Sequence, residues 1–236
     1  MHNAIVTGGT RGIGFAIAAA IRRAGGTVMI TGTDQSRVDD AIEALTALKG
    51  PGLVAGTVAD VRDRAAIDRL VRETVDRFGG LNTLVNNAGV GVFKDVSEMS
   101  GEEWARTLDV NLTGVFNCTS AALPALKQAR GAWVINIASL AGRNYFTGGA
   151  AYCASKAGLI AFSESLMQEV RTDDIRVSVV MPGSVATEFS GAVTSEHEEW
   201  KLSPDDVAEV VMDLLRHPGR SLPSKVEIRP SKPKKA

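Results

Sequence analysis

A tyrosine and a lysine four positions apart are the residues whose types and spacing best fit chemistry. Tyr152 and Lys156 lie in a stretch, residues 150–170, that is predicted to be helical, and this spacing places two side chains on one helix face. An unperturbed phenol titrates near about 10, and a neighbouring ammonium group favours the phenolate, so we expect a lowered pKa for Tyr152. Such a tyrosine can act as a general acid and base near neutral pH. A surface tyrosine above a solvated lysine would also fit the spacing alone.

Two further polar residues belong to the same predicted constellation. Ser139 follows the apolar run 133–138, at the carboxyl end of a predicted strand, which is where an open parallel sheet has its ligand crevice. Its hydroxyl can hydrogen-bond a substrate oxygen. Asn111 lies in an otherwise apolar predicted helix, where a buried amide needs hydrogen-bond partners whatever its role.

A glycine-rich turn near the N-terminus predicts a nucleotide site. The first predicted strand runs directly into residues 7–14, Thr-Gly-Gly-Thr-Arg-Gly-Ile-Gly, and an amphipathic helix begins inside this turn. Glycines allow the tight turn and the close approach of a pyrophosphate, and the helix N-terminus offers free N–H groups. The residues expected to contact the nucleotide here are Gly8, Thr10, Arg11, Gly12, Ile13 and Gly14.

Seven short apolar runs, separated by amphipathic stretches, must position these residues. The runs are rich in Val and Ile without strict alternation, which is typical of strands covered on both faces. They lie at residues 4–6, 28–30, 53–54, 84–85, 133–137, 177–180 and 226–228. Helices between successive strands require a parallel sheet with right-handed crossovers. We therefore predict an α/β protein with a doubly wound parallel-sheet Rossmann fold.

The chain is expected to form one domain over residues 1–230, followed by a disordered basic tail at 231–236. Residues 184–202 contain few apolar side chains, and a loop of this length beside a site could act as a lid. A helix is predicted to open after it, because Ser203 is a suitable cap residue and Pro204 suits the first helical position.

Composition excludes several classes of protein. Lys and Arg total 26 against 27 for Asp and Glu, so no net charge attracts nucleic acid or an anionic membrane. The two cysteines and three histidines are too scattered for a metal site. The start lacks a signal peptide, and no apolar run approaches the roughly 18 residues of a membrane span. We expect a cytoplasmic protein with no metal, nucleic-acid partner or membrane association.

The glycine turn and several later motifs resemble the classical short-chain dehydrogenase/reductase family. Gly8, Gly12 and Gly14 match its TGxxxGxG pattern. The other family motifs follow in the expected order: Asp60-Val61, Asn86-Asn87-Ala88-Gly89, Asn111, Ser139, Tyr152-x-x-x-Lys156 and Pro182-Gly183. The resemblance covers residues 4 to about 187.

The resemblance implies a nicotinamide dinucleotide and a role for each matching residue. It implies that Asp60 holds the adenine amino group and that Asn87 lies beside the adenosine ribose. It implies that Lys156 holds the nicotinamide ribose and that Asn111 anchors a water linking Lys156 to solvent. The remaining residues that it assigns to the cofactor are Val61, Ala88, Gly89, Tyr152, Pro182, Gly183, Val185 and Thr187. From the residues alone, Asp60 could instead cap the helix that begins near residue 62, and Val185 could be an ordinary loop residue.

The residue at the end of the second predicted strand distinguishes NAD from NADP binding. Alignment on the family pattern puts Gly32 where an acid would bind the 2′-hydroxyl of NAD, so no carboxylate repels a 2′-phosphate. Arg11 and Thr33 could bind that phosphate. We predict NADP(H), with NAD(H) as the alternative if the strand ends later and Asp34 binds the ribose.

These expectations combine into an NADP-dependent oxidoreductase that moves a hydride between nicotinamide and a carbonyl or secondary alcohol. Ser139 and Tyr152 would bind the oxygen, and Tyr152 would exchange the proton. A reductase of 3-oxoacyl groups on acyl carrier protein is the enzymatic alternative, although residues 221–230 depart from the usual end of that subgroup. An NADP-sensing regulator without turnover is the alternative from another class.

The predicted partners are a small carbonyl or alcohol substrate and further copies of the chain, as a homodimer or homotetramer. Loops after the fourth, fifth and sixth strands should line the substrate pocket. Their mostly apolar residues predict a neutral, partly apolar ketone or aldehyde, although some of the aromatics could face the core or an interface. They are Val90, Val92, Phe93, Leu140, Tyr145, Phe146, Phe189 and Trp200.

Overall fold

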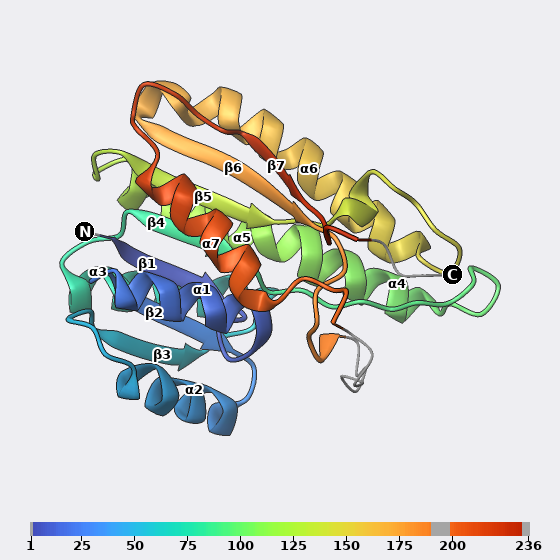
Figure 1. Ribbon diagram of the computed structural model, residues 1–236, viewed down its shortest axis with the longest axis horizontal. Helices are drawn as coiled ribbons and strands as arrows, with labels where there is room; N and C mark the ends of the chain where they lie inside the picture. The colour runs from blue at the N-terminus through green and yellow to red at the C-terminus, as the bar shows by residue number, and fades with distance from the viewer. Residues whose placement is uncertain (1, 190–198, 233–236) are drawn as a thin grey trace.

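The computed structural model describes residues 2–189 and 199–232, which form a three-layer α/β structure (Figure 1). Its sheet has seven strands in the order β3-β2-β1-β4-β5-β6-β7, and every neighbouring pair is parallel. The strands are β1 (Asn3–Thr7), β2 (Thr27–Gly32), β3 (Val54–Val58), β4 (Thr83–Asn86), β5 (Ala132–Ile137), β6 (Ile175–Pro182) and β7 (Lys225–Ile228). The doubly wound Rossmann fold predicted from the sequence is confirmed.

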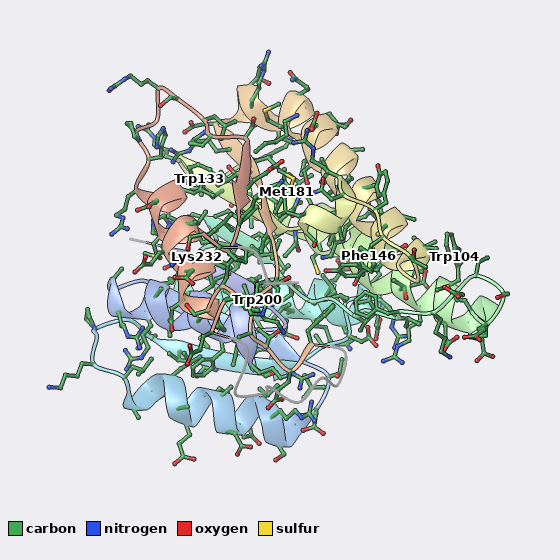
Figure 2. All side chains as sticks on the ribbon, turned by 45° about the vertical axis from the view of Figure 1, so that its right-hand side comes forward. Trp104, Trp133, Phe146, Met181, Trp200 and Lys232 are labelled. Atoms are coloured by element: carbon green, nitrogen blue, oxygen red, sulfur yellow. The ribbon has the colours of Figure 1, made fainter. Side chains whose placement is uncertain are left out.

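Helices cover both faces of the sheet because the central strands are apolar on both sides. One core lies under α1 (Gly12–Arg23), α2 (Gln35–Ala47) and α7 (Pro204–Arg216). The opposite core lies under α3 (Arg64–Phe78), α5 (Gly114–Leu126) and α6 (Ala150–Val170). Trp133 of β5 is fully buried between these layers (Figure 2).

The remaining helical segments lie near the carboxyl ends of the strands or connect the larger elements. They are α4 (Gly101–Leu108), the π-helical turn η1 (Asp109–Thr113) and the 3₁₀ turns η2 (Leu140–Gly142) and η3 (Arg171–Asp173). The chain reverses its strand order between β1 and β4, and ligands of open α/β sheets bind at such a switch point. No helix of the described residues has the length and apolar character needed to span a membrane.

Local sequence signals account for several boundaries. The helix predicted over residues 150–170 is α6, with the same bounds. Ser203 caps α7 through a capping box with Asp206, and Pro204 is its first residue, as predicted. Parts of the predicted lid and tail, residues 190–198 and 233–236, lie outside the described residues.

Candidate active site

The glycine turn between β1 and α1 is closed by the segment that follows β4. Gly8 has a φ of +62°, a conformation that favours glycine, and a Cβ at Gly14 would lie only 2.3 Å from the Gly8 carbonyl oxygen. The Asn87 side chain holds this turn, since its Nδ2 donates to the carbonyls of Thr7 at 3.0 Å and Gly8 at 3.1 Å. Asn87 therefore holds the glycine turn in its conformation. The motif alone did not reveal this role.

The N-terminus of α1 is left open for an anion. Its first residue follows Arg11, whose side chain makes no capping hydrogen bond, and the first turn carries no acidic residue. The unpaired N–H groups of such a terminus favour phosphate. Thr187, after β6, crosses the turn so closely that a Cβ at Gly12 would lie 3.3 Å from its methyl group. Arg11 Nη1 also donates to Glu188 Oε2 at 2.9 Å, which ties the segment after β6 to the glycine turn.

The end of β2 lies where the sequence placed it. Gly32 is the last residue of the strand, and a Cβ there would lie 2.7 Å from the Thr10 methyl group. Asp34 is the N-cap of α2 and accepts a hydrogen bond from the Arg37 backbone N–H at 2.9 Å. Asp34, the carboxylate nearest to Gly32 in the sequence, therefore caps α2.

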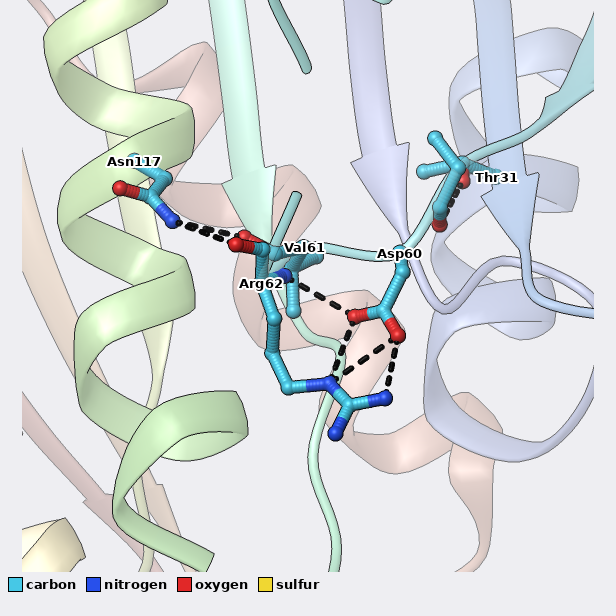
Figure 3. A network of polar contacts seen from close by, with 6 residues as sticks. Thr31, Asp60, Val61, Arg62 and Asn117 are labelled. Atoms are coloured by element: carbon cyan, nitrogen blue, oxygen red, sulfur yellow. Dashed lines mark hydrogen bonds and ion pairs between the residues drawn. The ribbon is translucent and has the colours of Figure 1, made fainter. Parts of the chain in front are cut away.

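The segment after β3 is anchored on both sides (Figure 3). Thr31 Oγ1 donates to the Ala59 carbonyl at 3.0 Å, and Asn117 Nδ2 of α5 donates to the Val61 carbonyl at 3.0 Å. Asp60, between them, does not cap α3, because the N-cap of that helix is Asp63.

The Asp60 carboxylate accepts hydrogen bonds from the Arg62 backbone and guanidinium, and these bonds hold the pKa of Asp60 below its ordinary value. Sequence reasoning missed the anchoring residue Asn117. An amide in an apolar helix, the signal that identified Asn111, could have found it.

Ser139, Tyr152 and Lys156 meet at the carboxyl end of β5. Ser139 follows this strand, and its Oγ accepts a hydrogen bond from the Ala141 N–H at 3.1 Å at the start of η2. Tyr152 is half-buried, and Ser139 is close enough to lower the pKa of its phenol. Lys156 Nζ lies 5.8 Å from the centre of the Tyr152 ring and donates to the Ile137 carbonyl at 2.9 Å. The predicted constellation therefore assembles in space.

The electrostatics of this group differ from the sequence expectation. Burial raises the pKa of the Tyr152 phenol, and the neighbouring Ser139 only partly opposes this. Burial also lowers the pKa of Lys156 to about 8, and among the described residues its ammonium group donates to a backbone carbonyl, with no carboxylate in an ion pair with it. The expected lowering of the Tyr152 pKa was wrong for the protein without cofactor, since burial raises this pKa and Lys156 is not among the groups that shift it.

Asn111 connects the helix of Tyr152 to the loop after β4. It is fully buried in η1, where its Oδ1 accepts from the Val90 N–H at 2.8 Å and its Nδ2 donates to the Val90 carbonyl at 2.9 Å. Nδ2 also donates to Ser155 Oγ at 3.0 Å, and Ser155 in turn donates to the Tyr152 carbonyl at 2.7 Å. Both amide donors are thus used by protein groups. Ser155, one residue before Lys156, is a positioning residue that sequence reasoning missed.

Three phenylalanine side chains lie near Tyr152 and form a chain of ring contacts with it. The ring centres of Phe93 and Phe189 lie 5.4 Å and 5.7 Å from that of Tyr152, and Phe146 lies 5.9 Å from Phe93. The exposed fractions of the three phenylalanines are 45%, 36% and 49%, in that order, so each has an accessible surface. Figure 2 shows Phe146 toward the end of the molecule that carries α4 and Trp104.

The other predicted pocket residues are less clearly grouped. Tyr145 is largely exposed, Leu140 is buried, and Val90, Val92 and Trp200 are half-buried. The basic residues of these loops are already paired. Lys94 contacts Glu103, and Arg143 contacts Glu227.

The fold and this site define an oxidoreductase built on a dinucleotide-binding sheet, acting on CH–OH or C=O groups. Residues 2–198 match the family model described as short chain dehydrogenase, and the chain belongs to this family. A 3-oxoacyl-(acyl-carrier-protein) reductase of Haemophilus influenzae is 38% identical over 85% of this chain and 81% of its own. A 3alpha-hydroxysteroid dehydrogenase of Mediterraneibacter gnavus is 35% identical over 80% of this chain and 76% of its own.

A solved structure is similar over almost the entire chain. An alcohol dehydrogenase of the archaeon Thermococcus sibiricus, complexed with 5-hydroxy-NADP, superposes with a TM-score of 0.90 at 29% identity. The similarity covers 98% of both chains.

Proposed function

We propose that this protein is an NADP-dependent reductase of neutral, partly apolar ketones or aldehydes, and that it also oxidises the corresponding alcohols. The observation that carries the proposal is the meeting of Ser139, Tyr152 and Lys156 at the carboxyl end of β5. A binding protein has no need of a buried lysine beside a tyrosine. This pairing therefore favours turnover over an NADP-sensing regulator.

The residues of the turn fit a dinucleotide. Glycines fill positions without room for a Cβ, and the N-cap residue Arg11 makes no side-chain hydrogen bond to the first turn of α1. Absence of an acid at Gly32 supports NADP(H) over NAD(H), as does the capping role of Asp34. The similar alcohol dehydrogenase, solved with an NADP derivative, supports the same choice.

The residues expected to hold the cofactor contribute in three groups. The glycine turn and α1 would hold the pyrophosphate, and Thr33 would hold the 2′-phosphate with Arg11, which would exchange its exposed ion pair with Glu188 for this contact. Lys156, whose ammonium group lies buried without a carboxylate, would hold the nicotinamide ribose. The backbone and side chains of Val61, Ala88, Gly89, Pro182, Gly183, Val185 and Thr187 would complete the site.

The chemistry requires a proton source beside the carbonyl oxygen, and the bound nicotinamide supplies the hydride. Ser139 is close enough to the Tyr152 hydroxyl to lower its pKa, so both hydroxyls could point at one substrate oxygen. Because burial raises the pKa of Tyr152, the phenol is protonated at neutral pH and is ready to donate in the reductive direction. Asn111 and Ser155 hold the Tyr152 helix against the loop after β4.

Aromatic surface around Tyr152 supports an apolar substrate. Phe93, Phe146 and Phe189 offer exposed faces beside the reacting group, and the nearby cations Lys94 and Arg143 are neutralised by ion pairs. A neutral carbonyl compound with an aliphatic or aromatic substituent would bury these faces, whereas an anionic keto acid would lose hydration against them while Lys94 and Arg143 are already paired.

Reduction of 3-oxoacyl groups on acyl carrier protein is the second candidate. The relative from Haemophilus influenzae with this activity favours it. The C-terminal segment, from Ser221 to Pro230, departs from the usual ending of that subgroup, and this is why we place it second.

We also propose a homodimer or homotetramer in the cytoplasm, with a small molecule as the only other partner. Trp104 on α4 and Phe116 on α5 are large exposed apolar side chains, and such side chains support self-association. Cys118 and Cys153 are both free and buried, which fits a reducing compartment.

Oxidation of NADPH, followed by its absorbance, tests the proposal with a panel of carbonyl compounds. The panel should include medium-sized aliphatic and aryl ketones, an aldehyde, an anionic keto acid and a 3-oxoacyl thioester of acyl carrier protein. We expect the highest kcat/KM for a neutral apolar compound, with NADPH preferred over NADH. Fastest reduction of the acyl thioester would favour the second candidate, and tight NADPH binding without turnover on any compound would favour a regulator.

A further inference from the structure

Among the described residues, Arg62 donates all the hydrogen bonds that the Asp60 carboxylate accepts (Figure 3). Arg62 donates from Nε to both carboxylate oxygens at 3.0 Å and from Nη2 to Oδ2 at 2.6 Å. Its backbone N–H donates to Oδ1 at 2.9 Å. An ionised carboxylate has about four acceptor positions. Arg62 therefore uses the acceptor capacity of the residue that the family pattern assigns to the adenine amino group.

Several features keep this pair formed although its side chains are 48% and 32% exposed. Exposed ion pairs usually contribute little to stability, but bidentate arginine–carboxylate pairs are stronger than other exposed pairs. The partners are two residues apart, so little chain entropy is lost. The segment is also fixed from both sides by Thr31 and Asn117. With the pKa of Asp60 lowered by Arg62, the carboxylate remains ionised and paired at neutral pH.

The pair lies where the base of a bound dinucleotide is expected. In this fold the pyrophosphate binds at the N-terminus of α1, and the adenosine ribose lies at the end of β2. The next strand outward is β3, and the segment after it touches the end of β2, since the Ala59 N–H donates to the Gly32 carbonyl at 3.0 Å. The base attached to that ribose therefore extends toward Asp60 and Arg62.

We propose that Arg62, anchored by Asp60, presents the polar group that meets the 6-position of the bound purine, so that the site accepts a 6-oxo purine about as well as adenine. This rests on the proposed function, because it concerns the same dinucleotide site. A guanidinium group carries donors only, and Arg62 Nη1 makes no hydrogen bond within the described residues. A donor suits a 6-oxo oxygen, whereas a free Asp60 carboxylate would select the amino group of adenine.

Binding of NADPH and of its hypoxanthine analogue, in which a 6-oxo group replaces the adenine amino group, tests the proposal. Dissociation constants would be measured by nucleotide fluorescence for the wild type, Arg62→Met and Arg64→Met. Arg64 is the matched control, because it also forms an exposed ion pair, with Asp68 at 2.9 Å, and its removal costs the same charge close by. The quantity compared is the ratio of the two dissociation constants. Both nucleotides carry the same phosphates, so a general loss of attraction for phosphate leaves this ratio unchanged.

The wild type and Arg64→Met should bind the two nucleotides within about threefold of each other. Arg62→Met should prefer NADPH by about tenfold or more, since a hydrogen bond to a charged group typically changes an equilibrium constant by this much. A change of the ratio by less than threefold in Arg62→Met would overturn the proposal. Failure of the wild type to bind either nucleotide would overturn the proposed function as well.

Discussion

Introduction of a carboxylate at the end of β2 should reverse the choice of cofactor. Gly32→Asp would set a negative charge where the 2′-phosphate of NADPH is expected and would offer an acceptor to the 2′-hydroxyl of NADH. A Cβ at this position lies 2.7 Å from the Thr10 methyl group, so the substitution also has a steric cost. Gly32→Ala is the matched control, because it carries the same Cβ without the charge.

The size of the effect follows from Coulomb's law. A carboxylate about 5 Å from a phosphate bearing about two negative charges costs about 1.5 kcal/mol in water, or roughly tenfold in NADPH affinity. A charge-assisted hydrogen bond to the ribose hydroxyl should improve NADH binding by about tenfold. The ratio of the two affinities should therefore change by about 100-fold between Gly32→Ala and Gly32→Asp.

Fluorescence titration of each variant with NADPH and NADH measures this ratio directly. Added salt should reduce the NADPH penalty, because it screens the repulsion. Equal ratios in Gly32→Ala and Gly32→Asp would refute the reasoning. So would a wild type that prefers NADH, which would mean that the ribose is read by another residue.

Three further predictions concern the substrate pocket, the positioning amide and the buried lysine. Phe93→Ala should raise the KM for apolar ketones by about fivefold. This is near the lower end of the effect of a lost aromatic contact, because the ring is 45% exposed. An unchanged KM in steady-state assays would show that Phe93 does not line the pocket. Asn111→Ala should lower the free energy of unfolding in urea by about 1 to 3 kcal/mol, because the Val90 N–H loses its acceptor; a loss below about 0.5 kcal/mol would contradict this. Burial lowers the pKa of Lys156 to about 8 from 10.5, so the folded protein loses this proton before the unfolded chain does. The free energy of unfolding of the cofactor-free wild type, relative to Lys156→Met, should therefore rise by on the order of 2 to 3 kcal/mol as the pH increases from about 8 toward 10.5. Urea titrations across this range measure the difference. A difference that does not change with pH would show that Lys156 is not desolvated.

The fold could be predicted from the sequence because its signals are local. Buried parallel strands are continuous apolar runs, and the run at residues 133–137 lies within β5. The start of α7 was visible in Ser203 and Pro204, since cap residues act within one helical turn. The end of β2 at Gly32 was placed correctly by alignment on the family pattern.

The hydrogen bonds that position the site could not be predicted, because they join residues far apart in the chain. Asn111 and Ser155 are 44 positions apart, and the carbonyl that Asn117 holds is 56 positions away from it. The direction of the Tyr152 pKa shift was missed because burial depends on packing against side chains from other loops. The pairing of Asp60 with Arg62 is local, and the spacing of the two residues could have revealed it.

The most direct test of the account is the loss of the Tyr152 hydroxyl. Tyr152→Phe keeps the ring and its aromatic contacts but removes the proton, and general acid catalysis is typically worth about 10² to 10⁴ in rate. The other tyrosine of the chain, the largely exposed Tyr145, provides the control variant Tyr145→Phe. With the best carbonyl substrate, Tyr152→Phe should bind NADPH within about threefold of wild type and lose at least about 100-fold in kcat, while Tyr145→Phe keeps both values. A Tyr152→Phe variant that retains more than about a tenth of the wild-type kcat would contradict the account.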